Sequence, residues 1–267
     1  MPVQLEDFHE GGITFTTLRI AHPPLNILDL DHCRELSSLI HQIRADDRCR
    51  VVVLRGDGSC FSAGVDIEQH TAELMPELLP AFHEVFHALL GLRAVTIAAV
   101  HGHCMGGAAE LVFACDRAIA EETARISLPE IKVGCYPPVA IPLLCARIGQ
   151  GRASEMILTG EGFPVARLVE WGLVDRVVPR GELDAGVSEE RARYHGKSPS
   201  VLGMAAALLH EEARRAWGDR IPALEGEYLE KLLPHPDATE GIAAFQERRP
   251  PRWAAPEEGI DPQEALR

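Results

Sequence analysis

The sequence of 267 residues contains few aromatic side chains, about 5%, and no long apolar run. No stretch approaches the roughly 20 apolar residues that cross a bilayer, so we expect no membrane partner. The first residues, MPVQLEDFHEGG, are acidic and lack the apolar segment of a secretory signal. These absences predict a cytoplasmic protein.

Positive charge is also scarce, since 26 basic and 40 acidic residues give a net charge of −14. Binding to the phosphate backbone of nucleic acid requires a basic surface, so nucleic acid is not an expected partner. A small anionic ligand remains compatible with this charge, because a few local donors can hold it.

Several familiar motifs are missing from the chain. The seven cysteines are scattered, odd in number and never spaced as CxxC, which is typical of free thiols in a reducing compartment. His101, His103 and Cys104 lie close together without further ligands at a recognisable spacing, so we expect no metal site. GxSxG, Walker and GxGxxG motifs are absent as well.

Short apolar segments alternate with helical patterns and glycine loops along the first two thirds of the chain. This alternation predicts an α/β fold of βαβ units around a mainly parallel sheet. Ser198 followed by Pro199 predicts the start of a helix. We expect a core over 1–196, a helical region over 197–250 and a loose tail over 251–267. Strands are predicted over 13–20, 50–54, 95–100, 117–120, 125–128 and 173–178, and helices over 30–44, 77–91 and 108–115.

Two glycine loops each follow a predicted buried strand, at the edge of a parallel sheet where ligands usually bind. The backbone N–H groups of Ala63 and Gly107, one from each loop, are candidate donors to a developing oxyanion. The dipole of the helix that begins near Gly107 adds partial positive charge there. From the residues alone, tight turns explain these glycines equally well.

Two glutamates are candidate acid and base. Glu110 lies in the apolar segment GGAAELVFAC, where an unpaired carboxylate is costly. Backbone N–H groups of the first helical turn, or an ion pair with Arg117, are the alternative explanation. Glu130 follows a predicted strand end and, taken alone, is expected to be solvated. Together, two glutamates beside one oxyanion hole suit proton transfer at carbons next to a carbonyl.

Several motifs in the same order as in the crotonase superfamily give the chain its resemblance to enoyl-CoA hydratases and isomerases. The resemblance implies a spiral of ββα units with a C-terminal helical region that builds homotrimers or dimers of trimers. It also implies an acyl-CoA thioester as substrate, with coenzyme A part of that substrate and no separate cofactor. The motifs are FSAGVDIEQH (61–70), AAVHGHCMGGAAELVFACDRAIA (98–120), ISLPEIKVG (126–134), RIGQGRASEMILTGEGFPVARLVEWGLVDRVVP (147–179) and HPDATEGIAAFQERRPPRW (235–253).

The resemblance also implies roles for single residues. It makes Ala63 and Gly107 the two oxyanion donors, and Glu110 and Glu130 the glutamate pair of the hydratases. Both glutamates together favour hydration over isomerisation, hydrolysis or decarboxylation. An isomerase, an acyl-CoA hydrolase and a non-catalytic acyl-CoA-binding protein remain the alternatives. Further binding residues are expected at Gly64, Asp66, Ile67, Gly106, Tyr136 and Pro137.

The sequence departs from the common hydratase pattern after Glu130. Residues 136–140, Tyr-Pro-Pro-Val-Ala, replace the usual Pro-Gly-Ala-Gly-Gly, and their bulk should reshape the acyl pocket. A short straight-chain substrate such as crotonyl-CoA is therefore not expected. The replacement is similar to the cyclohexa-1,5-diene-1-carbonyl-CoA hydratase branch, whose enzymes act in anaerobic degradation of aromatic acids.

Overall fold

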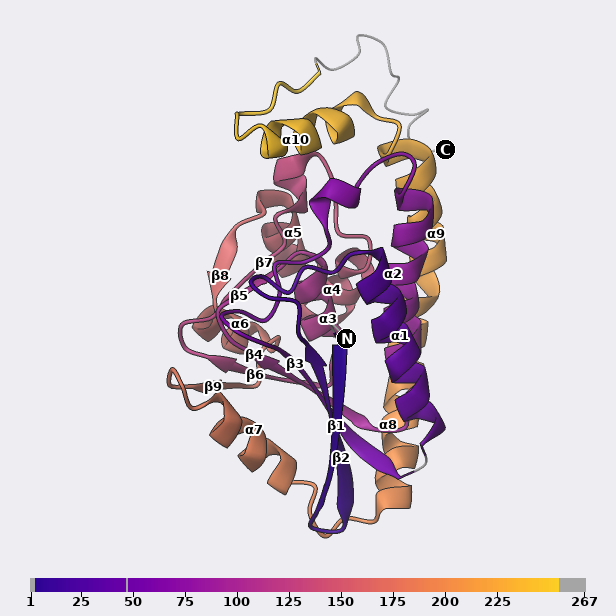
Figure 1. Ribbon diagram of the computed structural model, residues 1–267, viewed down its shortest axis with the longest axis vertical. Helices are drawn as coiled ribbons and strands as arrows, with labels where there is room; N and C mark the ends of the chain where they lie inside the picture. Colours follow the sequence, from indigo (N-terminus) through magenta and orange to yellow (C-terminus); the bar gives the residue numbers. More distant parts are fainter. Residues whose placement is uncertain (1–2, 47, 255–267) are drawn as a thin grey trace.

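A six-stranded sheet in the order β1-β2-β3-β4-β6-β9 forms the centre of the computed structural model, which describes residues 3–46 and 48–254 (Figure 1). β1 is antiparallel to β2, and every other pair in this sheet is parallel. Val53 of β3 lies between Thr17 of β2 and Ile97 of β4. The strands are β1 (Val3–Glu10), β2 (Ile13–Ile20), β3 (Cys49–Gly56), β4 (Val95–Val100), β6 (Arg117–Glu121) and β9 (Arg176–Val178).

A second sheet of three short strands extends from the first. β5 (His103–Met105) pairs in parallel with β7 (Arg125–Ser127), which pairs antiparallel with β8 (Gly162–Pro164). β5 follows β4 after two residues and leads directly into α3 (Gly107–Ala114). The end of the large sheet is thereby connected to a buried helix.

Helices cover both faces of the large sheet. α7 (Leu183–Ala192) covers one face through Leu183 and Val187, which pack with the side chains of β2, β3 and β4. The larger core lies on the other face and includes side chains of α1, α2, α3 and α4. The remaining helices are α1 (Leu30–Ala45), α2 (Met75–Leu90), α4 (Ala140–Ile148), α5 (Gln150–Thr159), α6 (Val165–Trp171), α8 (Pro199–Ala216), α9 (Ile221–Glu227) and α10 (Pro236–Gln246).

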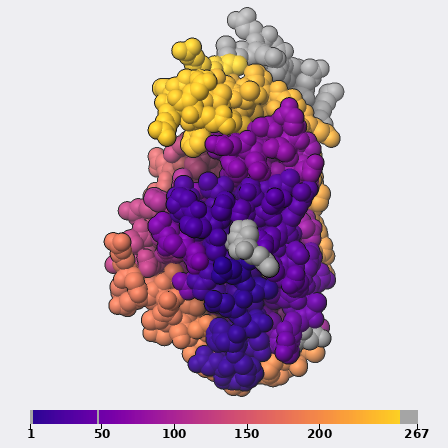
Figure 2. All heavy atoms as spheres, in the orientation of Figure 1, coloured from indigo at the N-terminus to yellow at the C-terminus, as the bar shows by residue number. Residues whose placement is uncertain are grey.

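α10 lies at one end of the molecule, against the loops that follow β3 and β7 (Figures 1 and 2). It contacts the 3-10 turns at Ile67–Gln69 and Glu130–Val133. The contact is close, because a Cβ on Gly241 of α10 would lie 2.3 Å from the carbonyl oxygen of Val133. Glycine at this position lets the helix backbone touch the loop that carries Glu130.

The predicted elements are found, with three strands missed. β1 was missed because most of its side chains are exposed, so it lacks the apolar alternation that reveals a strand. β5 and β8 have three residues each, too few for any periodicity. The expected strand over 173–178 is shorter than predicted, since β9 contains only Arg176–Val178.

The C-terminal helices begin as predicted at Ser198, whose side chain accepts a hydrogen bond from the Val201 N–H. Of the predicted loose tail, residues 255–267 lie outside the described residues. The Ala254 N–H donates to Asp237 of α10, so the part of the tail before it is attached to the helix. In the described ranges 3–46 and 48–254, no helix has the length and apolarity of a membrane span.

Candidate active site

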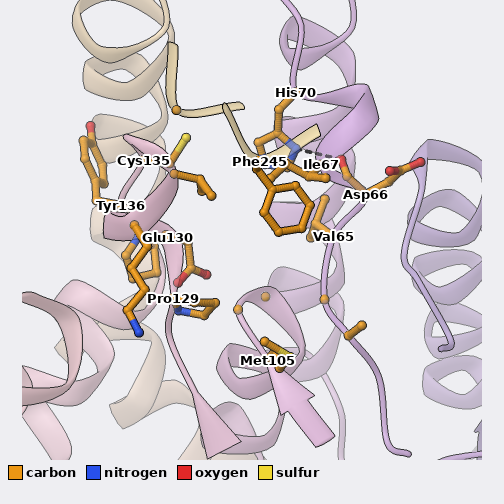
Figure 3. Close-up of a pocket in the computed structure, with 18 of the residues that line it drawn as sticks. Val65, Asp66, Ile67, His70, Met105, Pro129, Glu130, Cys135, Tyr136 and Phe245 are labelled. Atoms are coloured by element: carbon orange, nitrogen blue, oxygen red, sulfur yellow. Dashed lines mark hydrogen bonds between the residues drawn. The ribbon is translucent and has the colours of Figure 1, made fainter. Parts of the chain in front are cut away.

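A cavity of about 730 Å³ lies between α2, α10 and the loops that follow β3, β5 and β7 (Figure 3). Its volume is in the usual range for a small-molecule site. Every residue expected at the site lines it, namely Ala63, Gly64, Asp66, Ile67, Gly106, Gly107, Glu110, Glu130, Tyr136 and Pro137.

The two glycine loops meet at the floor of this cavity. The Met105 N–H donates to the Ser62 carbonyl oxygen at 3.1 Å, which holds the loop after β3 beside β5. A Cβ on Gly64 would lie 2.6 Å from the Met105 carbonyl oxygen, and the Gly64 φ of +96° also favours glycine. Close approach of two backbones is therefore the reason for glycine here.

Gly107 presents an open backbone donor. It is the first residue of α3, so its N–H has no acceptor within the helix. A Cβ at this position would lie 2.6 Å from the Phe82 ring and 2.8 Å from Val65, so a larger residue does not fit. An N–H at the start of a helix, with the helix dipole behind it, suits an anion, and the oxyanion role of Gly107 stays a prediction.

Ala63 differs from the expectation of a free donor. It borders the cavity, but its N–H donates to the Leu25 carbonyl oxygen at 2.9 Å. Serving as the second oxyanion donor requires the Ala63 N–H to exchange this carbonyl for the ligand oxygen. The role of Ala63 as an oxyanion donor therefore stays a prediction. The sequence alone does not reveal the competing acceptor, which is the carbonyl oxygen of residue 25.

Glu110 is buried, with 2% of its surface exposed, and is held by a second helix. Its Oε1 accepts a hydrogen bond from the Ala140 N–H at 2.6 Å, at the N-terminus of α4. The alternative ion pair with Arg117 is wrong, since Arg117 contacts Asp175 and Glu190 instead. Glu110 is therefore fixed by backbone donors outside its own helix.

Glu130 begins the 3-10 turn after β7, and its carboxyl group is buried rather than solvated. Its Oε1 lies 2.9 Å from the position that a Cβ on Gly106 would occupy. Its Oε2 is inaccessible and has no hydrogen-bond partner among the described residues. Buried polar atoms without a partner are rare in native structures, and a catalytic role is one recognised reason for them.

Burial raises the pKa of both glutamates, and the negative charge of Glu110 raises the pKa of Glu130 further. Two carboxyls that interact in this way titrate as a pair. A pair that retains one proton near neutral pH provides a general acid and a general base in one cavity.

The loop from Asp66 to His70 forms the opposite wall of the cavity. The Asp66 side chain caps the turn by accepting a hydrogen bond from the Glu68 N–H at 2.9 Å. His70 Nδ1 lies 2.7 Å from the Asp66 carbonyl oxygen (Figure 3), and burial lowers the pKa of His70. This imidazole is therefore a neutral part of the wall.

Sequence reasoning missed the contribution of the C-terminal helices. Tyr228, Phe245 and Arg249 line the same cavity, although they lie about 100 residues after Glu130. Phe245 and Arg249 lie in the motif over 235–253, but that motif did not assign them to the cavity, and no quoted motif contains Tyr228.

The sequence of the chain matches a known protein family. The model of the enoyl-CoA hydratase/isomerase family matches residues 10–256. The chain belongs to this family. Membership confirms the predicted superfamily and an enzyme of the enoyl-CoA hydratase type.

Two relatives share between 27% and 33% sequence identity with this chain. A probable enoyl-CoA hydratase of Mycobacterium tuberculosis is 33% identical over 236 residues, covering 86% of this chain and 90% of that protein. The cyclohexa-1,5-dienecarbonyl-CoA hydratase of Thauera aromatica is 27% identical over 243 residues, covering 88% of this chain and 91% of that protein.

Solved structures of the family confirm the fold. The crystal structure of an enoyl-CoA hydratase from Mycobacterium avium subsp. paratuberculosis superimposes with a TM-score of 0.80 at 28% identity. The match covers 94% of this chain and 98% of that one. The predicted crotonase fold with a helical C-terminal region is therefore confirmed.

Proposed function

We propose that this protein adds water across the double bond of an α,β-unsaturated acyl-CoA. The observation that carries this proposal is the pair of buried carboxyls, Glu110 and Glu130, on one cavity with the open N–H of Gly107. Coenzyme A enters as part of the substrate, and no metal or separate cofactor takes part in the proposed chemistry.

The thioester carbonyl oxygen accepts a hydrogen bond from the Gly107 N–H. Ala63 provides the second donor once its N–H has left the Leu25 carbonyl. Attack of water places negative charge on the thioester oxygen, which forms an enolate. Donors aimed at that charge stabilise the transition state more than the ground state, and this difference accelerates the reaction.

The two glutamates divide the proton transfers. Glu110, fixed by the α4 backbone, orients the attacking water and takes its proton while the hydroxyl oxygen bonds to the β carbon. Glu130 gives its proton to the α carbon as the enolate collapses. The product has gained one water, and the proton now on Glu110 returns to Glu130 to restore the pair. Exchanging the acid and base roles of Glu110 and Glu130 leaves the overall count of protons unchanged. The two carboxyls titrate as a coupled pair, so either can act as the acid.

The proposed substrate is a cyclic dienoyl-CoA of the cyclohexa-1,5-diene-1-carbonyl type. Tyr136, Pro137 and Pro138 line the cavity where a glycine-rich segment would leave more freedom. Flat, rigid side chains suit a planar ring better than a flexible short chain. The relative from Thauera aromatica that bears this activity in its name also supports the proposal.

Incubation with a panel of acyl-CoA thioesters, followed by mass analysis, tests the proposed reaction. A gain of one water with coenzyme A retained is the expected result. An isomer of unchanged mass identifies an isomerase, and free coenzyme A identifies a hydrolase. Binding without any turnover identifies a non-catalytic acyl-CoA-binding protein.

The same panel tests the substrate. The protein should hydrate cyclohexa-1,5-diene-1-carbonyl-CoA with a higher kcat/KM than crotonyl-CoA. A preference for crotonyl-CoA would contradict the cyclic substrate and leave the hydratase proposal standing.

A further inference from the structure

The far end of the cavity is formed by a group of side chains that we call the acyl end: Cys135, Tyr136, Pro137, Pro138 and Tyr228. Its position follows from the proposed function, on which this inference rests. A thioester oxygen at Gly107 places the reacting carbons at the glutamates. The rest of the acyl group then points beyond Glu110, whose Oε1 is bound to the segment that follows Pro138.

The wall with Asp66 lies on the other side of the reacting carbons. Figure 3 shows Tyr136 on one side of Glu130 and Val65 and Asp66 on the other. The cavity therefore has two distinct ends. The acyl end is the one that the acyl group must enter.

Tyr228 closes the acyl end from a distant part of the chain. It begins a π-helical turn, Tyr228–Leu232, in which the Leu233 N–H donates to the Tyr228 carbonyl oxygen at 2.8 Å. Such turns are rare in proteins as a whole, and those that do occur are often found at functional sites. The side chain lines the cavity and has 3% of its surface exposed.

An edge-to-face contact holds the Tyr228 ring against Tyr136. Its centroid lies 5.3 Å from that of Tyr136 with the ring planes at 71°, an edge-to-face pair. Tyr136 in turn follows Cys135, whose N–H donates to the Glu130 carbonyl oxygen at 3.0 Å. The ring is thus connected to the same loop that positions the catalytic carboxyl.

We propose that Tyr228 is a specificity-determining residue whose ring closes the acyl end and limits the length of the acyl group. The ring and the prolines beside it accept a compact acyl group and exclude a long chain. The size limit depends on the volume of the ring and much less on the hydroxyl oxygen.

Binding of saturated acyl-CoAs tests this limit without any turnover. Isothermal titration with butyryl-, hexanoyl-, octanoyl- and decanoyl-CoA gives a dissociation constant for each chain length. Affinity should rise by roughly tenfold for each added pair of methylenes while the chain is being buried, then stop rising or fall once it meets Tyr228. A steady rise through decanoyl-CoA in the wild type would overturn the proposal.

We call the chain length at which affinity stops rising the break. Truncation of the Tyr228 ring should move the break to longer chains. Tyr228→Ala and Tyr228→Leu should bind the first chain length that the wild type rejects about tenfold more tightly or better. Tyr228→Phe retains the ring and should keep the wild-type break. Tyr194→Ala is the matched control, because Tyr194 packs against the core on the opposite face of the sheet.

Folded truncation variants with the wild-type dependence on chain length would overturn the proposal. If neither variant folds, the break in the wild-type series still decides it. The outcomes also separate this inference from the proposed reaction. If the variants change the chain length at which affinity stops rising but no thioester is hydrated, only the proposed reaction is refuted. If thioesters are hydrated but that chain length is the same in the variants, only this inference is refuted.

Discussion

Glu130 has a buried carboxyl without a partner for Oε2, and this arrangement has a cost in stability. Burial and the charge of Glu110 raise its folded-state pKa above the unfolded value of about 4.3. Below pH 4 both states are protonated and the cost is absent. As the pH rises through the folded-state pKa, the unfolded chain ionises freely and the folded protein loses stability.

Glu130→Gln should therefore raise the free energy of unfolding at pH 8 by about 1 kcal/mol or more. The gain should vanish near pH 4, where the carboxyl is neutral in both states. Denaturant unfolding at the two pH values measures it. Glu170→Gln, at an exposed position, is the matched control and should change little. A variant less stable than the wild type at pH 8 would contradict this account of Glu130.

Gly106 is required both by its backbone and by its neighbour. Its φ is +56°, and a Cβ would lie 2.9 Å from Glu130 Oε1. Gly106→Ala should cost about 1–3 kcal/mol from backbone strain and should also displace the Glu130 carboxyl. Hydration should fall by about a hundredfold, because a small displacement of a catalytic group is enough.

Gly181→Ala separates these two effects. Gly181 has a φ of +84°, and no atom lies within 4 Å of the position of its Cβ. It should lose comparable stability while keeping full activity per folded molecule. Equal rates for Gly106→Ala and Gly181→Ala would refute the contact with Glu130 as the cause.

Helix α8 is attached to the sheet by an ion pair between a buried imidazole and a half-buried carboxylate. His210 Nδ1 lies 2.9 Å from the Leu92 carbonyl oxygen, and Nε2 lies 3.0 Å from Asp116 Oδ2. Both partners only accept, so both ring nitrogens carry a proton and the imidazole is cationic. Burial opposes this charge, but Asp116 and the Leu92 carbonyl together raise the pKa of His210.

His210→Leu should lower the free energy of unfolding by about 1–3 kcal/mol at pH 6, because the half-buried Asp116 carboxylate loses its cationic partner. The raised pKa means that the contribution of His210 is present below about pH 6.5 and is lost as the pH rises through the folded-state value. The loss should therefore be smaller at pH 9. His41→Leu, on the exposed face of α1, is the control. A loss that grows with pH would contradict a cationic His210.

At the level of elements, what could be predicted from the sequence depended on local signals. β4 and α3 were predictable because Val95–Val100 is apolar except for Thr96 and α3 begins at a glycine pair. β1 was not, because its pairing is made by the backbone of an exposed edge strand. The motif around Glu110 located the site, but its partner Ala140 became evident only from the packing of α4 on α3.

At the scale of the whole molecule, the family resemblance predicts a homotrimer or a dimer of trimers. Light scattering after size exclusion should give three or six times the 29.2 kDa of the chain. α8 carries apolar side chains that the single chain leaves exposed, including Leu208 at 69%. Clustered exposed apolar groups of this kind usually mark a protein contact, and we expect the partner here to be a second copy of this chain.

Leu208→Asp should weaken that assembly and lower the mass toward that of one chain. Leu158→Asp, at a second exposed leucine outside α8, is the control and should keep the wild-type mass. A monomeric wild type would contradict the prediction of an oligomer. An unchanged mass for Leu208→Asp would place the contact elsewhere.

The central claim is that Glu110 and Glu130 act together on one thioester in one cavity. The most direct test is the hydration rate of Glu110→Gln and Glu130→Gln, measured beside their affinity for a saturated acyl-CoA. We expect each variant to lose at least about a hundredfold in kcat while its dissociation constant stays within a few-fold of the wild type. Near-wild-type hydration by either variant would contradict the claim.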